Sequence, residues 1–445
     1  MKKTTLVVLA LAIALGGYVY YSEFRNVKEK PAEDAPKPLF TFSIDDVASM
    51  RVTRPGEAAP LVLESSADGW KLTSPVATRA DRFAAESAVN SVVHASSSRS
   101  LPADPAKMKE FGLDPPAASV EIRTKNGQTQ KLDLGGKDFS DQNVYARADG
   151  AKDVLLVPDS VFTGVTRPLG EIRDRAILQL ASWSLTEMDT RTAKAKFRIE
   201  KKGEYWDMTD PRTAPADGDD AENLKNALSA ERFADVVEEQ ALASALGKYG
   251  LSSPELTVHV RNEQGGEATL QVGKKDGTKY FARDAARPMV FHIEEAFAKK
   301  FMDLTYASLR SKRVLRAKAD DFTGYTVRNE KTTLKVALSK DGKWMVEEPA
   351  DRKGKEVAVT RMLDPLTNTR AAEVLDPPPA NIAAKLAKPA VDLTFTGKDG
   401  VVTTVAISAK DGDAVYVRSS RYPAIFRFDG GFLLQFGFSA EEIAP

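Results

Sequence analysis

Trp70-Lys71-Leu72-Thr73-Ser74-Pro75 is the first of three copies of one pattern, in which a Trp is followed by any residue, an apolar residue, two more residues and a Pro. The second copy is Trp206-Asp207-Met208-Thr209-Asp210-Pro211, and the third is Trp344-Met345-Val346-Glu347-Glu348-Pro349. The tryptophans are 136 and then 138 residues apart. Self-similarity at a steady interval indicates repeated structural units.

Two further landmarks keep the same register. Phe111-Gly112-Leu113 ahead of Pro116 returns as Tyr249-Gly250-Leu251 ahead of Pro254, and as Ala384-Lys385-Leu386 ahead of Pro389. Tyr145-Ala146-Arg147 returns as Phe281-Ala282-Arg283 and Tyr416-Val417-Arg418. Because three landmarks stay in step, the sequence predicts three tandem degenerate repeats. The third copy has lost the glycine of the second landmark and is the most eroded.

Each copy shows the same order of local signals. Apolar, strand-like runs surround turns such as Asp68-Gly69 and Asp341-Gly342, and Asp-Gly favours hairpins because both residues tolerate positive φ. A segment with helical spacing follows in each copy, carried by Val89, Val92 and Val93 in copy one, by Leu224, Ala227 and Leu228 in copy two, and by Val359, Met362, Leu363 and Leu366 in copy three. A shorter helix is expected to end at Gly112 and Gly250, and further hairpins come after it. Antiparallel hairpins with packed helices predict the α+β class.

The length of 445 residues suggests about three domains. The predicted division is an N-terminal membrane anchor or signal peptide (1–21), a spacer rich in Pro, Glu and Lys (22–40), and three α+β repeats (41–178, 179–315 and 316–445, the last one degenerate).

The N-terminus predicts the location of the chain. Lys2 and Lys3 precede an apolar run from Leu6 to Tyr21, just long enough to span a bilayer as a transmembrane helix. The short positive region before it favours a cytoplasmic N-terminus, with the bulk of the chain outside the cytoplasmic membrane and periplasmic if the cell has an outer membrane. A cleaved signal peptide, with Ala14 and Gly16 near the cleavage site, is the alternative.

Composition excludes several kinds of chemistry. There is no cysteine, which excludes thiol nucleophiles, thiolate metal sites and disulfides. The 63 Lys and Arg residues balance 63 Asp and Glu residues, so no overall field attracts nucleic acid, and no nucleic-acid partner is expected.

Individual residues give few leads to a site, and we predict no catalytic, cofactor-binding or metal-binding residues. The repeat tryptophans could stack on sugars, but their fixed position among varying neighbours favours a core role. His94, His259 and His292 lack the spacing of a zinc motif. The run from Asp217 to Asp220 fails as an EF-hand loop and is predicted to be a turn before a helix.

One basic stretch at the junction of copies two and three is less ordinary. It comprises Lys299, Lys300, Arg310, Lys312, Arg313, Arg316 and Lys318. Such a stretch is typical of either a solvated segment between modules or a contact surface for an anionic partner or lipid headgroups.

The chain resembles a known family, the "domain of unknown function 4340" proteins. The resemblance rests on the three landmarks and on Leu169-Gly170-Glu171-Ile172-Arg173-Asp174-Arg175 at the end of copy one. The corresponding stretch of copy two is Leu309-Arg310-Ser311-Lys312-Arg313. It implies a single-anchor membrane protein, often associated with an ABC-type transporter of the gliding-motility kind. It implies no catalytic residues.

These observations predict a non-enzymatic, membrane-anchored accessory or scaffold protein outside the cytoplasm, with an ABC-type transporter or a cell-surface assembly as its partner. One alternative is a protein that binds envelope polysaccharide, peptidoglycan or lipid. Another is a hydrolase that uses paired carboxylates, which would require acidic groups converging in a pocket.

Overall fold

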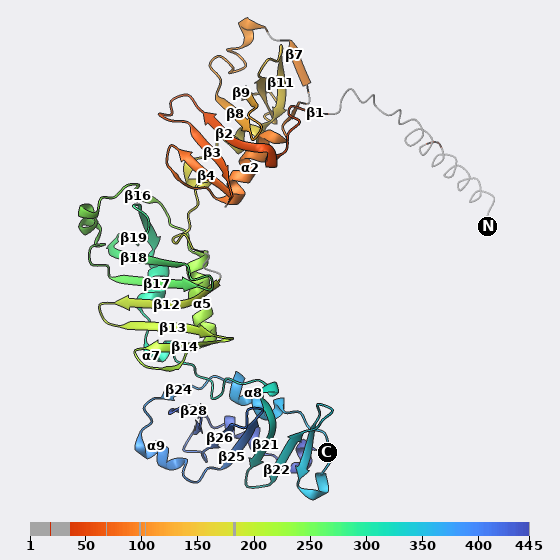
Figure 1. Ribbon diagram of the computed structural model, residues 1–445, viewed down its shortest axis with the longest axis vertical. Helices are drawn as coiled ribbons and strands as arrows, with labels where there is room; N and C mark the ends of the chain where they lie inside the picture. The colour runs from red at the N-terminus through yellow and green to blue at the C-terminus, as the bar shows by residue number, and fades with distance from the viewer. Residues whose placement is uncertain are drawn as a thin grey trace, which may run out of the picture. The chain divides into compact units, whose positions relative to one another are not determined.

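A computed structural model describes Tyr18 and residues 36–67, 69–97, 99–102, 104–180 and 184–444. These residues form three large antiparallel sheets and one two-stranded sheet, with helices packed against them (Figure 1). The α+β class predicted from the sequence is therefore confirmed. The chain divides into two compact units, residues 1–175 and 176–445.

The first unit contains the first large sheet. Its nine strands are, in spatial order, β5 (Thr78–Arg79), β4 (Gly69–Ser74), β3 (Leu61–Ser66), β2 (Val47–Thr53), β8 (Ala118–Thr124), β9 (Thr129–Lys137), β10 (Asn143–Ala148), β11 (Asp153–Pro158) and β7 (Arg99–Pro102). The two-stranded sheet pairs β1 (Lys37–Pro38) with β6 (Ser96–Ser97). The helices are α2 (Arg82–Val93), α3 (Asp159–Val165) and α4 (Leu169–Ile172), with the 3₁₀ turns η3 (Ile44–Asp46) and η4 (Pro105–Lys107).

The second unit begins with another nine-stranded sheet. Its spatial order is β15 (Ala214–Pro215), β14 (Tyr205–Asp210), β13 (Lys196–Lys202), β12 (Leu185–Thr192), β17 (Leu256–Asn262), β18 (Glu267–Asp276), β19 (Lys279–Asp284), β20 (Val290–Glu294) and β16 (Val236–Glu238). Its helices are α5 (Gly218–Ala230), α6 (Glu295–Met302) and α7 (Tyr306–Leu309), with the 3₁₀ helix η6 (Ala243–Tyr249). We call this sheet with its helices the second module.

The third sheet, with its helices the third module, follows in the same unit. Its eight strands are β23 (Trp344–Glu348), β22 (Thr333–Leu338), β21 (Phe322–Arg328), β25 (Val391–Gly397), β26 (Val402–Ile407), β27 (Ala414–Ser419), β28 (Ile425–Asp429) and β24 (Glu373–Leu375). Its helices are α8 (Thr360–Asn368), α9 (Ala380–Lys385) and α10 (Ala440–Ile443), with η7 (Ala319–Asp321), η8 (Ala350–Arg352) and η9 (Phe432–Phe436). The strand order matches that of the other two sheets, except that the first short edge strand is missing.

The Trp-to-Pro elements form β4, β14 and β23, and each ends at a proline preceded by a cis peptide bond. Trp70 and Trp206 are buried in the cores of their sheets. Trp344 is half-buried against its own core, with its ring 5.8 Å from that of Tyr325. The predicted core role of the tryptophans is confirmed, and none of the three offers an open stacking platform.

The other two landmarks meet in a small second cluster beside each main core. The rings of Phe111 and Tyr145 lie 4.5 Å apart, and those of Tyr249 and Phe281 lie 4.9 Å apart. In the third module, Leu386 and Tyr416 share the corresponding cluster. The landmarks therefore stay in register because they are packing partners.

The glycine of the second landmark is required by two features at once. Gly250 has a φ of +74°, and a Cβ there would lie 2.6 Å from the backbone nitrogen of Lys274. The facing Gly273 is equally confined, since its Cβ would lie 2.1 Å from the carbonyl oxygen of Tyr249. The third copy has Lys385 in the landmark and Ser408 after β26, so both glycines of the contact have been lost there together.

The predicted long helices are confirmed as α2, α5 and α8. The predicted short helix ends at Gly250 as expected, but in the first copy it is wrong in its extent. There η4 ends at Lys107, and the chain reaches Gly112 through turns. These turns are hydrogen-bonded, from the N–H of Phe111 to the carbonyl oxygen of Lys107 and from the N–H of Gly112 to that of Lys109, and they end at the positive φ of Gly112.

The predicted anchor, Leu6 to Tyr21, lies outside the described residues except for Tyr18. Among the residues that are described, no helix is both long and apolar enough to cross a membrane.

Candidate functional site

A polar network in the second unit surrounds Arg310, at the end of α7. Arg310 is only 2% exposed. Its guanidinium donates hydrogen bonds to the carbonyl oxygens of Pro215 (3.2 Å) and Ser311 (3.1 Å), and it faces the rings of Tyr422 and Phe426. Burial lowers the pKa of Arg310. A buried arginine needs a carboxylate to offset the loss of water.

Asp376, from the third module, supplies that carboxylate. Its Oδ2 lies 3.7 Å from Nε of Arg310 and accepts a 2.7 Å hydrogen bond from the hydroxyl of Tyr306. Arg212 donates to the carbonyl oxygen of Asp376 at 2.7 Å and stacks over the Tyr306 ring at 4.2 Å. Burial, followed by the hydrogen bond to Asp376, raises the pKa of Tyr306. Arg212 also forms an ion pair with Oδ1 of Asp376 at 3.4 Å, so one carboxylate of the third module joins three side chains of the second.

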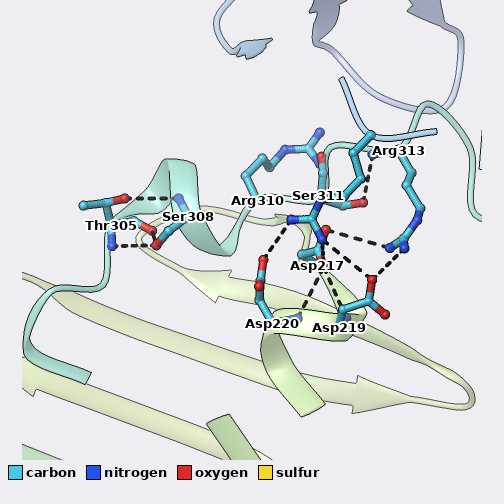
Figure 2. A network of polar contacts seen from close by, with 9 residues as sticks. Asp217, Asp219, Asp220, Thr305, Ser308, Arg310, Ser311 and Arg313 are labelled. Carbon is cyan, nitrogen blue, oxygen red and sulfur yellow. Dashed lines mark hydrogen bonds and ion pairs between the residues drawn. The ribbon is translucent and has the colours of Figure 1, made fainter. Parts of the chain in front are cut away.

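A second carboxylate joins the modules in the opposite direction (Figure 2). Asp217 is fully buried and caps the N-terminus of α5, accepting hydrogen bonds from the backbone of Asp219 and Asp220. Its Oδ1 also lies 3.1 Å from Nη1 of Arg370, which follows α8 in the third module. Arg313 approaches the other oxygen to 3.8 Å. Asp217 therefore starts a helix and binds the next module with the same carboxylate.

The two acids of the first turn of α5 complete this cluster. Asp219 accepts a 2.6 Å hydrogen bond from Arg313, and Asp220 accepts one of 3.1 Å from Arg370. The hydrogen bond from Arg313 is the main cause of the lowered pKa of Asp219. Carboxylates at a helix N-terminus are stabilised by the helix dipole as well. Asp219 is thereby held ionised, which is unsuited to donating a proton to a substrate.

Arg316 makes the third connection. It donates to the carbonyl oxygen of Trp206 at 2.6 Å, to Asp207 at 2.5 Å and to the hydroxyl of Tyr422 at 3.4 Å. The repeat tryptophan is thereby connected through its own backbone to the segment that enters the third module. Lys318 forms a further ion pair with Glu204.

These contacts account for the three arginines of the basic stretch. Arg310, Arg313 and Arg316 recur every third residue, and their partners within the unit are acids and carbonyl groups. Lys299 pairs with Glu295 on α6. Lys300 and Lys312 differ from the others, because both line a cavity beside the network.

The first large sheet with its helices, the first module, repeats part of this arrangement. Arg173 is buried and forms a β-bridge with Ala80, as Arg310 does with Ala216. Asp81 caps α2 as Asp217 caps α5. The paired positions Asp81 and Asp217, each at the same distance after its Trp, were a signal in the sequence that our interpretation did not use.

The histidines do not form a metal centre. His94 lies at the end of α2, and His259 contacts Thr269 in the neighbouring strand. His292 lies between Asp235 (2.9 Å) and Asp276 (3.1 Å). Among the residues that the structure describes, no group of three His, Cys, Asp or Glu side chains is placed to hold a metal ion.

The recurrence of these features has a counterpart among known families. The family model "Domain of unknown function (DUF4340)" matches residues 70–207 and again residues 206–389. The chain belongs to the DUF4340 family. Each match begins at a repeat tryptophan, Trp70 or Trp206, and extends into the strands of the following sheet.

Other comparisons add nothing to this membership. No curated protein matches the DUF4340 chain. Among solved structures, the DNA polymerase sliding clamp from Pseudomonas aeruginosa with ligand is 9% identical, with 89% of this chain and 94% of that chain covered and a TM-score of 0.17. The DNA polymerase III subunit beta from the same organism gives 9% identity, coverage of 87% and 92%, and a TM-score of 0.15. Likenesses this low carry no argument.

Proposed function

We propose that this DUF4340 protein is a non-enzymatic scaffold with three degenerate copies of one module, attached to the cytoplasmic membrane by Leu6 to Tyr21. The bulk of the chain lies outside the cytoplasm and works with an ABC-type transporter or a cell-surface assembly. Support for the anchor is the apolar run after Lys2 and Lys3, and support for the transporter is the family resemblance.

One observation supports a scaffold in particular. Asp217, fully buried, is shared between the cap of α5 and Arg370 of the next module. Buried ion pairs contribute little net stability, but removing one partner is costly, so they are well suited to fixing a single arrangement. A scaffold that holds a partner at a defined place benefits when its modules keep a fixed orientation relative to one another.

The exposed apolar side chains suggest where a partner would bind. Phe139 is 96% exposed. Its loop is braced by Asp138, which accepts hydrogen bonds from Ser140 and Asn143. Leu242 in the second module and Leu434 in the third are also largely exposed.

Photo-crosslinking in the native membrane tests the proposal. Benzoylphenylalanine would replace Phe139, Leu242 or Leu434 in turn, with exposed Gln128 as the matched polar position. We expect membrane-fraction adducts with an ABC-type permease from at least one apolar position and none from Gln128. A chain found wholly in the soluble fraction, or adducts containing no membrane protein, would contradict the proposal.

A further inference from the structure

A cavity of about 760 Å³ opens beside the Asp217 network, between α5, α6, α7 and the segment that carries Arg370. This volume lies within the range of small-molecule sites. Asp220 and Ser308, both labelled in Figure 2, line it. The cavity is therefore formed by both modules of the second unit and borders the contacts that join them.

The floor of the cavity is aliphatic. Leu224 and Leu309 are buried residues of the second core, while Ala227 and Leu304 pack against that core from its edge. The exposed Ala230 lies at the end of α5 and forms part of the wall. Such a surface favours hydrocarbon over a sugar or a nucleotide.

The polar part of the lining is positively charged. Lys300, Lys312 and Arg370 are its cations, and Asp220 is its acid. Asp220 is already paired with Arg370, whereas neither lysine has an ion pair within the described part of the chain. Lys300 acts electrostatically on Glu231 without forming an ion pair with it, so both ammonium groups can still donate hydrogen bonds to an anion. Asn223 and Asn226 add amide donors.

We infer that this cavity binds an anionic single-chain amphiphile, with the hydrocarbon against Leu224 and Leu309 and a carboxylate or phosphate between Lys300 and Lys312. An aliphatic floor and a cationic side match the two ends of such a molecule, and ionic hydrogen bonds to a headgroup are stronger than neutral ones. Because Arg370 belongs to the third module, the bound molecule contacts both modules.

The test uses the full chain in nanodiscs of zwitterionic lipid and a photoreactive palmitate analogue as the probe. Labelled peptides are mapped by mass spectrometry. We expect labelling within residues 218–230 and 295–312. Excess palmitate or palmitoyl-lysophosphatidate should compete, and their relative potency identifies the carboxylate or the phosphate as the preferred headgroup. Hexadecanol and inorganic phosphate should not compete.

Two variants and one control separate this site from unspecific partitioning. Lys300→Gln combined with Lys312→Gln should reduce labelling about tenfold or more, and Ala230→Trp should reduce it by filling the cavity without removing a charge. Lys299→Gln is the control, because Lys299 lies beside Lys300 on α6 but outside the cavity, and it should leave labelling unchanged. Circular dichroism of each variant verifies folding. Labelling elsewhere only, equal competition by hexadecanol, or equal labelling of the lysine double variant and the control would overturn the inference.

Discussion

Replacing Asp217 by alanine should lower the free energy of unfolding of the second unit more than replacing Asp81 by alanine lowers that of the first unit. Both residues cap a helix, and both accept backbone hydrogen bonds at its first turn. Only Asp217 also has described ion pairs with residues beyond its helix, namely Arg313 and Arg370. Asp81→Ala is therefore a matched control that removes a cap alone.

The expected magnitudes follow from these contacts. Losing an N-cap costs about 1 kcal/mol. Removing one partner of a buried ion pair costs about 3–5 kcal/mol. The side chain of Arg370 is 38% exposed and regains water, and both arginines keep Asp219, so we reduce that term to about 2 kcal/mol. Asp217→Ala should then cost about 3 kcal/mol and Asp81→Ala about 1 kcal/mol.

Hydrogen exchange measured by mass spectrometry on the full chain can separate the two effects. In Asp217→Ala, protection should fall in α5 and also in residues 310–318 and 369–372, where Leu315 and Ala371 donate backbone hydrogen bonds. In Asp81→Ala, the loss should be confined to α2 and its surroundings. Equal losses of stability for the two variants, or unchanged exchange at 369–372 in Asp217→Ala, would refute the reasoning.

Three further predictions concern the fold of the second module and can be checked by chemical denaturation. Gly250→Ala should cost about 3 kcal/mol of stability, because it combines a positive φ with a backbone clash. Gly265→Ala, at a φ of +80° in open space, should cost about 1 kcal/mol. Equal costs would contradict the packing argument. Trp206→Ala should cost about 4 kcal/mol, and the half-buried Trp344→Ala clearly less; an unchanged transition for Trp206→Ala would contradict its core role. Burial raises the pKa of Glu222, but hydrogen bonds from Lys225 and Trp206 outweigh this and lower it to about 2. Since the folded pKa is depressed, its stabilisation is present above about pH 4.5 and lost as the pH falls toward 2. Because the carboxylate is 36% exposed, we expect the ionised Glu222 to contribute about 1 kcal/mol of stability, and Glu222→Gln to lack this pH-dependent contribution. If Glu222→Gln lost the same stability between pH 4.5 and 2, Glu222 would not be the cause of the acid sensitivity.

The sequence predicted the class of fold because its signals were local. Each Asp-Gly turn lies between strand-like runs, and each helix has a continuous apolar face, so neighbours along the chain were sufficient. The landmarks in constant register added the prediction of repeated modules. That Phe111 packs on Tyr145, and Tyr249 on Phe281, was not predicted, because nothing local indicates which landmarks are in contact.

The polar network could not be predicted in the same way. Arg310, Arg313 and Arg316 form a basic run in the sequence, and nothing local shows that their partners are Asp207, Asp217, Asp219 and Asp376, which lie many residues away. Charge has no period comparable to that of a buried helix face. The one usable signal was the equal spacing of Asp81 and Asp217 after their tryptophans.

The absence of cysteine allows a direct measurement of the central claim, that these contacts fix the third module on the second. Spin labels on Ser253→Cys and Lys340→Cys, both exposed, report the distance between the modules by double electron–electron resonance. We predict one narrow distance distribution in the otherwise unchanged chain and a broad one when Asp217→Ala and Asp376→Ala are added. A broad distribution before these changes, or the same narrow distribution after them, would contradict the account.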